Sequence, residues 1–146
     1  MQPMIYVLGS LKNAQVPHVG NLLRAKGWDV FDDWHGGGPE ADDEWKRYEQ
    51  VRGRSYTEAL YDRYANHIFS FDREHLDLAV AGVLLLPAGK SAHLELGYLA
   101  GQGKRTYILY DQDESDTSRW EVMYQFATGV AVSEASLLEM VGEPHG

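Results

Sequence analysis

Residues 83–98 read VLLLPAGKSAHLELGY, which combines a continuous apolar run, a short loop and the start of a helical pattern. The apolar run ends at Pro87 and is typical of a buried parallel strand. The glycine and serine that follow lead into a helix whose first turn lies at the carboxyl end of that strand. Ligands of open α/β sheets bind at this edge. Glu95 has mostly apolar neighbours in this helix, so its carboxylate must be paired, hydrogen-bonded or used in function.

The rest of the chain alternates strand and helix patterns in the same way. A strand, a helix and a second strand occupy the first 31 residues, which indicates a parallel βαβ unit. Five strands in all predict one α/β domain, doubly wound around a five-stranded parallel sheet, of the flavodoxin or Rossmann-like class. The domain spans residues 1–142, and residues 143–146 are expected to be a disordered tail. The other expected strands are 4–8, 28–31, 105–110 and 129–132, and the other expected helices are 16–26, 71–79, 120–128 and 134–141.

Residues 32–43 form a predicted loop with three glycines and one proline, in which Trp34 and His35 provide two ring surfaces. One interpretation is a solvent loop with a tucked tryptophan. The other is a mobile flap that closes over a planar ligand, which makes Trp34 a candidate binding residue.

The segment 44–69 is predicted to be mostly helical, with a break or bend at Gly53. It carries an aromatic stripe that keeps to one helical face. A single small sheet does not need so many large rings to cover it, so we interpret the stripe as a subunit interface and predict a homodimer or a higher homo-oligomer. The stripe consists of Tyr48, Tyr56, Leu60 and Tyr64.

The composition argues against several classes of function. A net charge of −9, from 13 basic and 22 acidic side chains, argues against a nucleic-acid surface. The absence of cysteine excludes disulfides, thiolate chemistry and cysteine-ligated zinc. The six histidines show no ligand spacing, so we expect no metal site and no cofactor. Because there is no apolar run of about 18 residues and no basic segment ahead of the first strand, we expect no membrane association and a cytoplasmic location.

Four motifs in order resemble the nucleoside 2-deoxyribosyltransferase superfamily, which includes the 2′-deoxynucleoside 5′-monophosphate N-glycosidases. The resemblance covers nearly the whole chain. It implies an enzyme that cleaves or transfers the N-glycosidic bond of a small 2′-deoxynucleoside or its 5′-monophosphate, with either water or a second base accepting the sugar. The first motif is YVLGSLK at 6–12, and the second is Asp72, ten residues before Gly82. The third has three parts: GKS at 89–91, ELGY at 95–98 and GK at 103–104. The fourth is ATGV at 127–130.

The resemblance also implies roles for three residues. Glu95 matches the carboxylate that attacks the anomeric carbon, and Tyr6 matches the tyrosine that holds it, while the helix N-terminal turn helps to keep it ionised. Asp72 matches the general acid that protonates the departing base. Net retention is expected, with the two carboxyl groups roughly 5 Å apart. Two alternatives remain: Asp72 only caps a helix that starts at Arg73, or Asp77 is the acid.

Further positions match substrate-binding residues of that family. Ser10 and Ser91 match the serines that bind phosphate in the monophosphate-cleaving branch, although the spacing from Ser91 to Glu95 is short for that branch. Ordinary turn and cap chemistry is the alternative for both serines. Backbone amides and a lysine could complete such a phosphate site. These additional candidates are Gly9, Gly89, Lys12 and Lys90.

The late helix reaches into a neighbouring subunit's site in the family. Met123 and Tyr124 fall near that position, so Tyr124 is a further candidate binding residue.

Two other functions compete with the enzyme. A non-catalytic nucleotide-binding or sensing module would keep the fold, but it has no need of two carboxylates that face a sugar. A flavin-binding domain would need a hydroxyl-rich phosphate loop, which the turn at 9–13 lacks.

Overall fold

A five-stranded parallel sheet forms the centre of the protein in the computed structural model, which describes residues 2–145. The strand order is β2-β1-β3-β4-β5, which is the flavodoxin-like order of doubly wound domains, and the predicted five-stranded parallel sheet is confirmed. All five residues of the central strand β3 are buried, which explains the continuous apolar run in the sequence. The strands are β1 (Met4–Leu8), β2 (Asp29–Phe31), β3 (Ala81–Leu85), β4 (Arg105–Leu109) and β5 (Gly129–Ala131).

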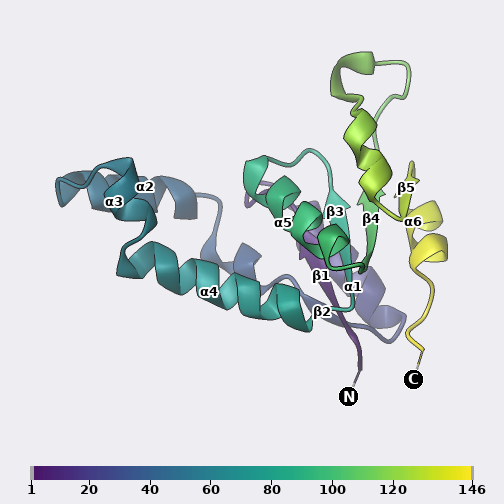
Figure 1. Cartoon of the computed structure of the whole chain (residues 1–146). Helices are drawn as coiled ribbons and strands as arrows, with labels where there is room; N and C mark the ends of the chain where they lie inside the picture. The colour runs from purple at the N-terminus through teal and green to yellow at the C-terminus, as the bar shows by residue number, and fades with distance from the viewer. Residues whose placement is uncertain (1, 146) are drawn as a thin grey trace.

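Helices cover both faces of the sheet (Figure 1). The helices α1 (Gln15–Ala25) and α6 (Glu134–Val141) bury Ile5 and Val7 on one face, whereas α4 (Arg63–Leu78) and α5 (Lys90–Gly101) pack on the other. Since side chains alternate along a strand, Tyr6 points to the side of α4 and α5. In β3, Gly82 allows a close approach, because a Cβ there would lie only 2.5 Å from Leu99 of α5.

An arm of helices stands away from the sheet (Figure 1). It consists of α2 (Ala41–Val51), α3 (Tyr56–Leu60) and the first half of α4. The predicted break at Gly53 is confirmed, since its φ of 71° lies in the left-handed region between α2 and α3. Ser55 then starts α3 with a capping box that it forms with Glu58.

The single helical face predicted for the aromatic stripe is wrong, because the chain turns both before α3 and after it. The rings of Tyr48 and Tyr64 nevertheless meet, with centroids 6.1 Å apart. Large apolar side chains of the arm are exposed, among them Tyr56 at 69% and Tyr61 at 75%. An ion network holds α2 against the start of α4: buried Glu49 accepts from Arg52 at 2.8 Å, and Asp62 pairs with Arg52 and Arg54 at 3.2 and 3.1 Å.

Three predicted elements need correction. The helix predicted at 71–79 is the end of the longer α4, since no helix breaker lies between Arg63 and Leu78. The predicted loop at 32–43 contains the 3₁₀ helix η1 (Asp33–Gly37) and the first turn of α2.

The predicted helix at 120–128 is instead a 3₁₀ helix, η3 (Val122–Phe126), preceded by η2 (Thr117–Arg119). Val122, Met123 and Phe126 are exposed there, so no packed apolar face stabilises a regular α-helix.

The end of the chain lies beside the start of β2. Residues 142–145 form no helix or strand, and Trp28 Nε1 donates to the Gly142 carbonyl at 2.9 Å. The predicted disordered tail at 143–146 includes Gly146, which lies outside the described residues. Within residues 2–145, no helix is both long enough and apolar enough to cross a membrane.

Candidate active site

Tyr6 and Glu95 meet above the face of the sheet that α4 and α5 cover. Tyr6 lies in the middle of β1 and is almost fully buried, with 1% of its surface exposed. Its hydroxyl donates a hydrogen bond of 2.8 Å to Oε2 of Glu95. Glu95 is the sixth residue of α5, where its neighbours Ala92, Leu96 and Leu99 are buried in the core. The contact between Tyr6 and Glu95 that the resemblance implies is therefore present in the structure.

Burial controls the ionisation of this carboxylate. It raises the pKa of Glu95 to about 7, the hydrogen bond from Tyr6 lowers that pKa, and the nearby Asp72 raises it. The expectation that the helix N-terminal turn keeps Glu95 ionised is wrong, since Glu95 lies in the second turn and the effect of the dipole fades within the first. Burial also raises the pKa of the Tyr6 hydroxyl, with further contributions from Glu95 and Asp72. Tyr6 is therefore a neutral donor.

Asp72 belongs to the same group of side chains. It is half-buried on α4, and burial raises the pKa of its carboxyl to about 6, against an opposing effect of His75. The charge of Asp72 raises the pKa of both Glu95 and Tyr6, so Asp72 lies near these two side chains. Asp72 cannot cap a helix at Arg73, because α4 begins ten residues earlier, at Arg63.

Asp77 has a different environment. It is exposed and accepts hydrogen bonds from Tyr98 at 2.6 Å and Gln102 at 3.0 Å. The bond from Tyr98 makes the largest contribution to lowering the pKa of Asp77. A carboxylate that is held ionised on the surface is a poor proton donor, so of the two aspartates only Asp72 has a raised pKa of the kind that a proton donor needs.

An aromatic cluster lies beside the carboxyl pair. Phe31, at the end of β2, is opposite Tyr6 in the sheet, and the two ring centroids are 5.0 Å apart. His75 stacks on Phe31 at 3.9 Å with an interplanar angle of 13°. The sequence reasoning missed both residues. The available signals were the parallel pairing of β1 with β2 and the position of His75 three residues after Asp72 on a helix.

The predicted phosphate-binding residues gather around a second location, which we call the Ser10 hollow. It has a volume of about 420 Å³. Gly89 is the residue that precedes α5, so the N-terminus of that helix lies at this hollow. Ser10 Oγ accepts from the backbone N–H of Lys12 at 3.1 Å. The lining residues are Ser10, Lys12, Asn13, Ala14, Gln15, Pro87, Ala88 and Gly89.

Gly9 and Ser91, the other two residues proposed to bind the phosphate, do not line the Ser10 hollow. Gly9 is adjacent in the chain, and a Cβ there would lie 3.1 Å from Val16 Cγ2, so the turn packs closely on α1. Ser91 is exposed in the first turn of α5 and is not among the residues that line the hollow.

Trp34 is a tucked side chain. Its Nε1 donates to the Val7 carbonyl at 2.8 Å, and its ring packs against the apolar clusters on both faces of the sheet. His35, next to it, is 3.0 Å from the Asn13 carbonyl. These two contacts fix η1 at the carboxyl edge of the sheet, and a role for Trp34 in ligand binding stays a prediction.

Tyr124 contacts α5 through His93. Its hydroxyl is 2.8 Å from Nε2 of His93, and the Nδ1 of that histidine is 2.7 Å from the Gly89 carbonyl. Because a carbonyl only accepts, Nδ1 donates and Nε2 accepts from Tyr124. His93 and Glu95 are two residues apart, so their side chains leave the helix in different directions.

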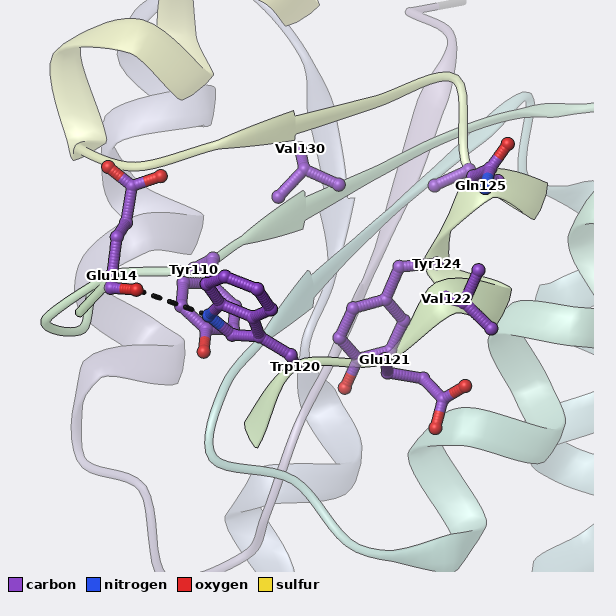
Figure 2. Close-up of a pocket in the computed structure, with 9 residues that line it drawn as sticks. Tyr110, Glu114, Trp120, Glu121, Val122, Tyr124, Gln125 and Val130 are labelled. Carbon is purple, nitrogen blue, oxygen red and sulfur yellow. Dashed lines mark hydrogen bonds between the residues drawn. The ribbon is translucent and has the colours of Figure 1, made fainter. Parts of the chain in front are cut away.

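Tyr124 also lines a surface hollow of about 640 Å³ together with Tyr110 and Trp120 (Figure 2). The proximity of this hollow to a neighbouring subunit's site stays a prediction. Among residues 2–145, no group of three or more metal-ligating side chains is close enough together to hold an ion.

The fold and the site define a doubly wound α/β domain that carries a tyrosine-bound carboxylate on the face of its sheet covered by α4 and α5. The sequence matches no family model and no curated protein. Among solved structures, the CMP N-glycosidase BcmB from Clostridium botulinum is similar in fold, with a TM-score of 0.52. It is 11% identical, and the match covers 94% of this chain and 97% of that one.

Proposed function

We propose that this protein cleaves or transfers the N-glycosidic bond of a 2′-deoxynucleoside or its 5′-monophosphate. The observation that carries the proposal is the hydrogen bond that Tyr6 donates to Glu95. It is supported by the nearby carboxyl group of Asp72, whose pKa is raised by burial. Glycosidic cleavage with retention uses two carboxyl groups, one as the nucleophile and one as the acid. The fold shared with a CMP N-glycosidase supports the same chemistry.

In the proposed reaction, ionised Glu95 attacks the anomeric carbon as the bond to the base breaks. Asp72 gives its proton to the departing base, so the electron pair of the broken bond leaves with a neutral base. The Tyr6 hydroxyl orients the attacking oxygen. Water or a second base then displaces Glu95 from the sugar, and Asp72 takes the proton from that nucleophile. Two displacements at one carbon give net retention.

The Ser10 hollow is the proposed phosphate site. The exposed N–H groups at the start of α5, the Ser10 hydroxyl and Lys12 are donors suited to a dianion. Gly89 has open space where a Cβ would stand, so the backbone there can approach a ligand. Gly9 and Ser91 do not line the hollow, and we propose that they contribute from the adjacent turn and from the first turn of α5. The net charge of −9 opposes anion binding at long range, but salt screens this effect beyond about 8 Å, so the local donors dominate.

A homodimer, or a higher homo-oligomer, is part of the proposal. The arm and the segment η2–η3 both carry large exposed apolar side chains, including Phe69 at 62% and Phe126 at 75%. Surfaces of this kind are typical of subunit interfaces. The Tyr124 segment is the proposed contact with a neighbouring site.

The decisive experiment is incubation with a panel of nucleosides and nucleotides, both ribo and deoxyribo, with and without a free acceptor base, followed by chromatography. Hydrolysis releases sugar and base, whereas transfer needs the acceptor and gives a new nucleoside. Glu95→Ala should abolish turnover, and a 2-fluoro-2-deoxy substrate should add mass to the peptide that contains Glu95. Tight nucleotide binding with no product from any substrate would favour the non-catalytic module instead.

A further inference from the structure

We infer that His75 selects the base of the substrate, by accepting a hydrogen bond from the amino group of a 4-aminopyrimidine such as cytosine. The inference rests on the proposed function and names the substrate class of the same site. It predicts discrimination against uracil and thymine, which carry a carbonyl oxygen at that position.

The imidazole of His75 is held in a fixed orientation. One face stacks on Phe31 at 3.9 Å, and the Phe71 ring lies edge-on at 4.7 Å and 61°. Nδ1 is 2.8 Å from the Phe71 carbonyl oxygen, one turn earlier in α4. Two rings and one hydrogen bond therefore restrict both side-chain torsions. A ring that is immobilised before binding loses little entropy when it contacts a ligand.

The same hydrogen bond determines which nitrogen carries the proton. A backbone carbonyl can only accept, so Nδ1 donates to Phe71, and the neutral ring has its lone pair on Nε2. Within residues 2–145, the structure gives this Nε2 no hydrogen-bond partner. His75 is only half-buried, so part of its side chain is exposed to solvent.

The position of His75 relative to Asp72 matches the two edges of a pyrimidine. The two residues are three apart in α4, which puts both side chains on one face of the helix with about 5–6 Å between their Cβ atoms. Protonated Asp72 is a donor for the O2 atom of the departing base, and Nε2 of His75 is an acceptor for its 4-amino group. Cytosine can make both contacts, because its O2 atom accepts from Asp72 and its 4-amino group donates to His75.

Uracil presents an oxygen at position 4, so two acceptors would face each other at His75. Such a mismatch leaves a partly buried acceptor without a donor, which costs more than the loss of an apolar contact. Phe71 lies between Asp72 and the arm, and its ring is 43% exposed, so it offers a surface on which a planar base can stack.

The test compares kcat/KM for the cytosine and uracil monophosphates, in both the ribo and deoxyribo series. We expect the wild-type protein to prefer cytosine by at least about tenfold. His75→Phe keeps a ring against Phe31 but removes the acceptor, and it should bring the ratio to within about threefold of unity. His67→Phe is the matched control, since His67 is exposed on the same helix, and it should leave the ratio unchanged.

A second variant covers the case in which His75→Phe does not fold. The amide of His75→Gln can both accept and donate, so it should also reduce the preference for cytosine. Equal rates for the two bases in the wild-type protein, or an unchanged preference in both variants, would overturn the inference.

Binding separates this inference from the proposed function. Calorimetry with Glu95→Gln should show that CMP binds more tightly than UMP, and His75→Phe in that background should remove the difference. Selective binding without turnover in the wild-type protein would contradict the proposed function and support the role of His75. Turnover without base preference would support the proposed function and refute the role of His75.

Discussion

Glu95→Gln should stabilise the protein at alkaline pH, because it removes a charge that the fold buries. The pKa of Glu95 rises from its ordinary value of 4.5 to about 7 on folding, which corresponds to about 3 kcal/mol once the group is fully ionised. The sign follows from proton binding: between pH 4.5 and 7 the folded state holds more protons than the unfolded state, so stability falls as the pH rises. Because Glu95 is only half-buried, solvent reduces this free energy. We therefore expect the Tm of Glu95→Gln at pH 8 to exceed that of the wild type by about 5–10 °C.

The measurement is thermal unfolding of wild type and Glu95→Gln at pH 5 and at pH 8. At pH 5 the two proteins should differ little, since the wild-type carboxyl is then mostly protonated and Gln can still accept from Tyr6. Asp77→Asn is the control of opposite sign, because the hydrogen bond from Tyr98 lowers the pKa of Asp77 and the ionised form is the stable one. Equal Tm values at pH 8, or a stabilisation that is the same at both pH values, would refute the reasoning.

Three further predictions concern activity and assembly. The pH profile of kcat/KM should be bell-shaped with a maximum near pH 6.5. Glu95, with a pKa of about 7, must be ionised, while Asp72, with a pKa of about 6, must be protonated. At the maximum, about one molecule in twenty has both groups in the required state. Asp72→Asn should lose the alkaline limb, and a wild-type profile that is flat from pH 5 to 8 would contradict the assignment. The monophosphate should be preferred over the free nucleoside. Ser10→Ala or Ser91→Ala should reduce kcat/KM for the monophosphate alone by roughly tenfold to a hundredfold, because hydrogen bonds to a charged group contribute about 1.5–3 kcal/mol. Equal wild-type kcat/KM values for the two substrates would exclude the phosphate site. Light scattering at micromolar concentration should give at least a dimer mass, and an active monomer would contradict the assembly.

The sequence was informative where local pattern and topology agree. The apolar runs predict the five strands, and their alternation with helices predicts a parallel sheet. The contact between Tyr6 and Glu95 followed from the family resemblance and not from this pattern. The resemblance added Asp72, and burial on α4 explains why it differs from Asp77.

Other features depend on contacts between distant segments, which a local pattern does not contain. The stacking of His75 on Phe31 joins α4 to β2, and the hydrogen bond from Trp34 to Val7 joins η1 to β1. The predicted helix at 120–128 failed because Val122, Met123 and Phe126 are exposed, so they provide no continuous packed face for a regular helix. The raised pKa of Glu95 could not be predicted either, since it depends on how deeply the second turn of α5 is buried.

The sparse packing of the arm makes it a separate unit of local unfolding. Apart from Glu49 and Ala59, no residue of α2 or α3 is buried, so opening this segment exposes little new apolar surface. The hydrogen-bonded amides of β1 and β3 should therefore exchange with deuterium only on global unfolding, whereas those of α2 should exchange through a low-energy opening. If the arm is covered in an oligomer, its protection becomes a function of protein concentration. Dilution would then release a segment of the chain long before it unfolds the domain.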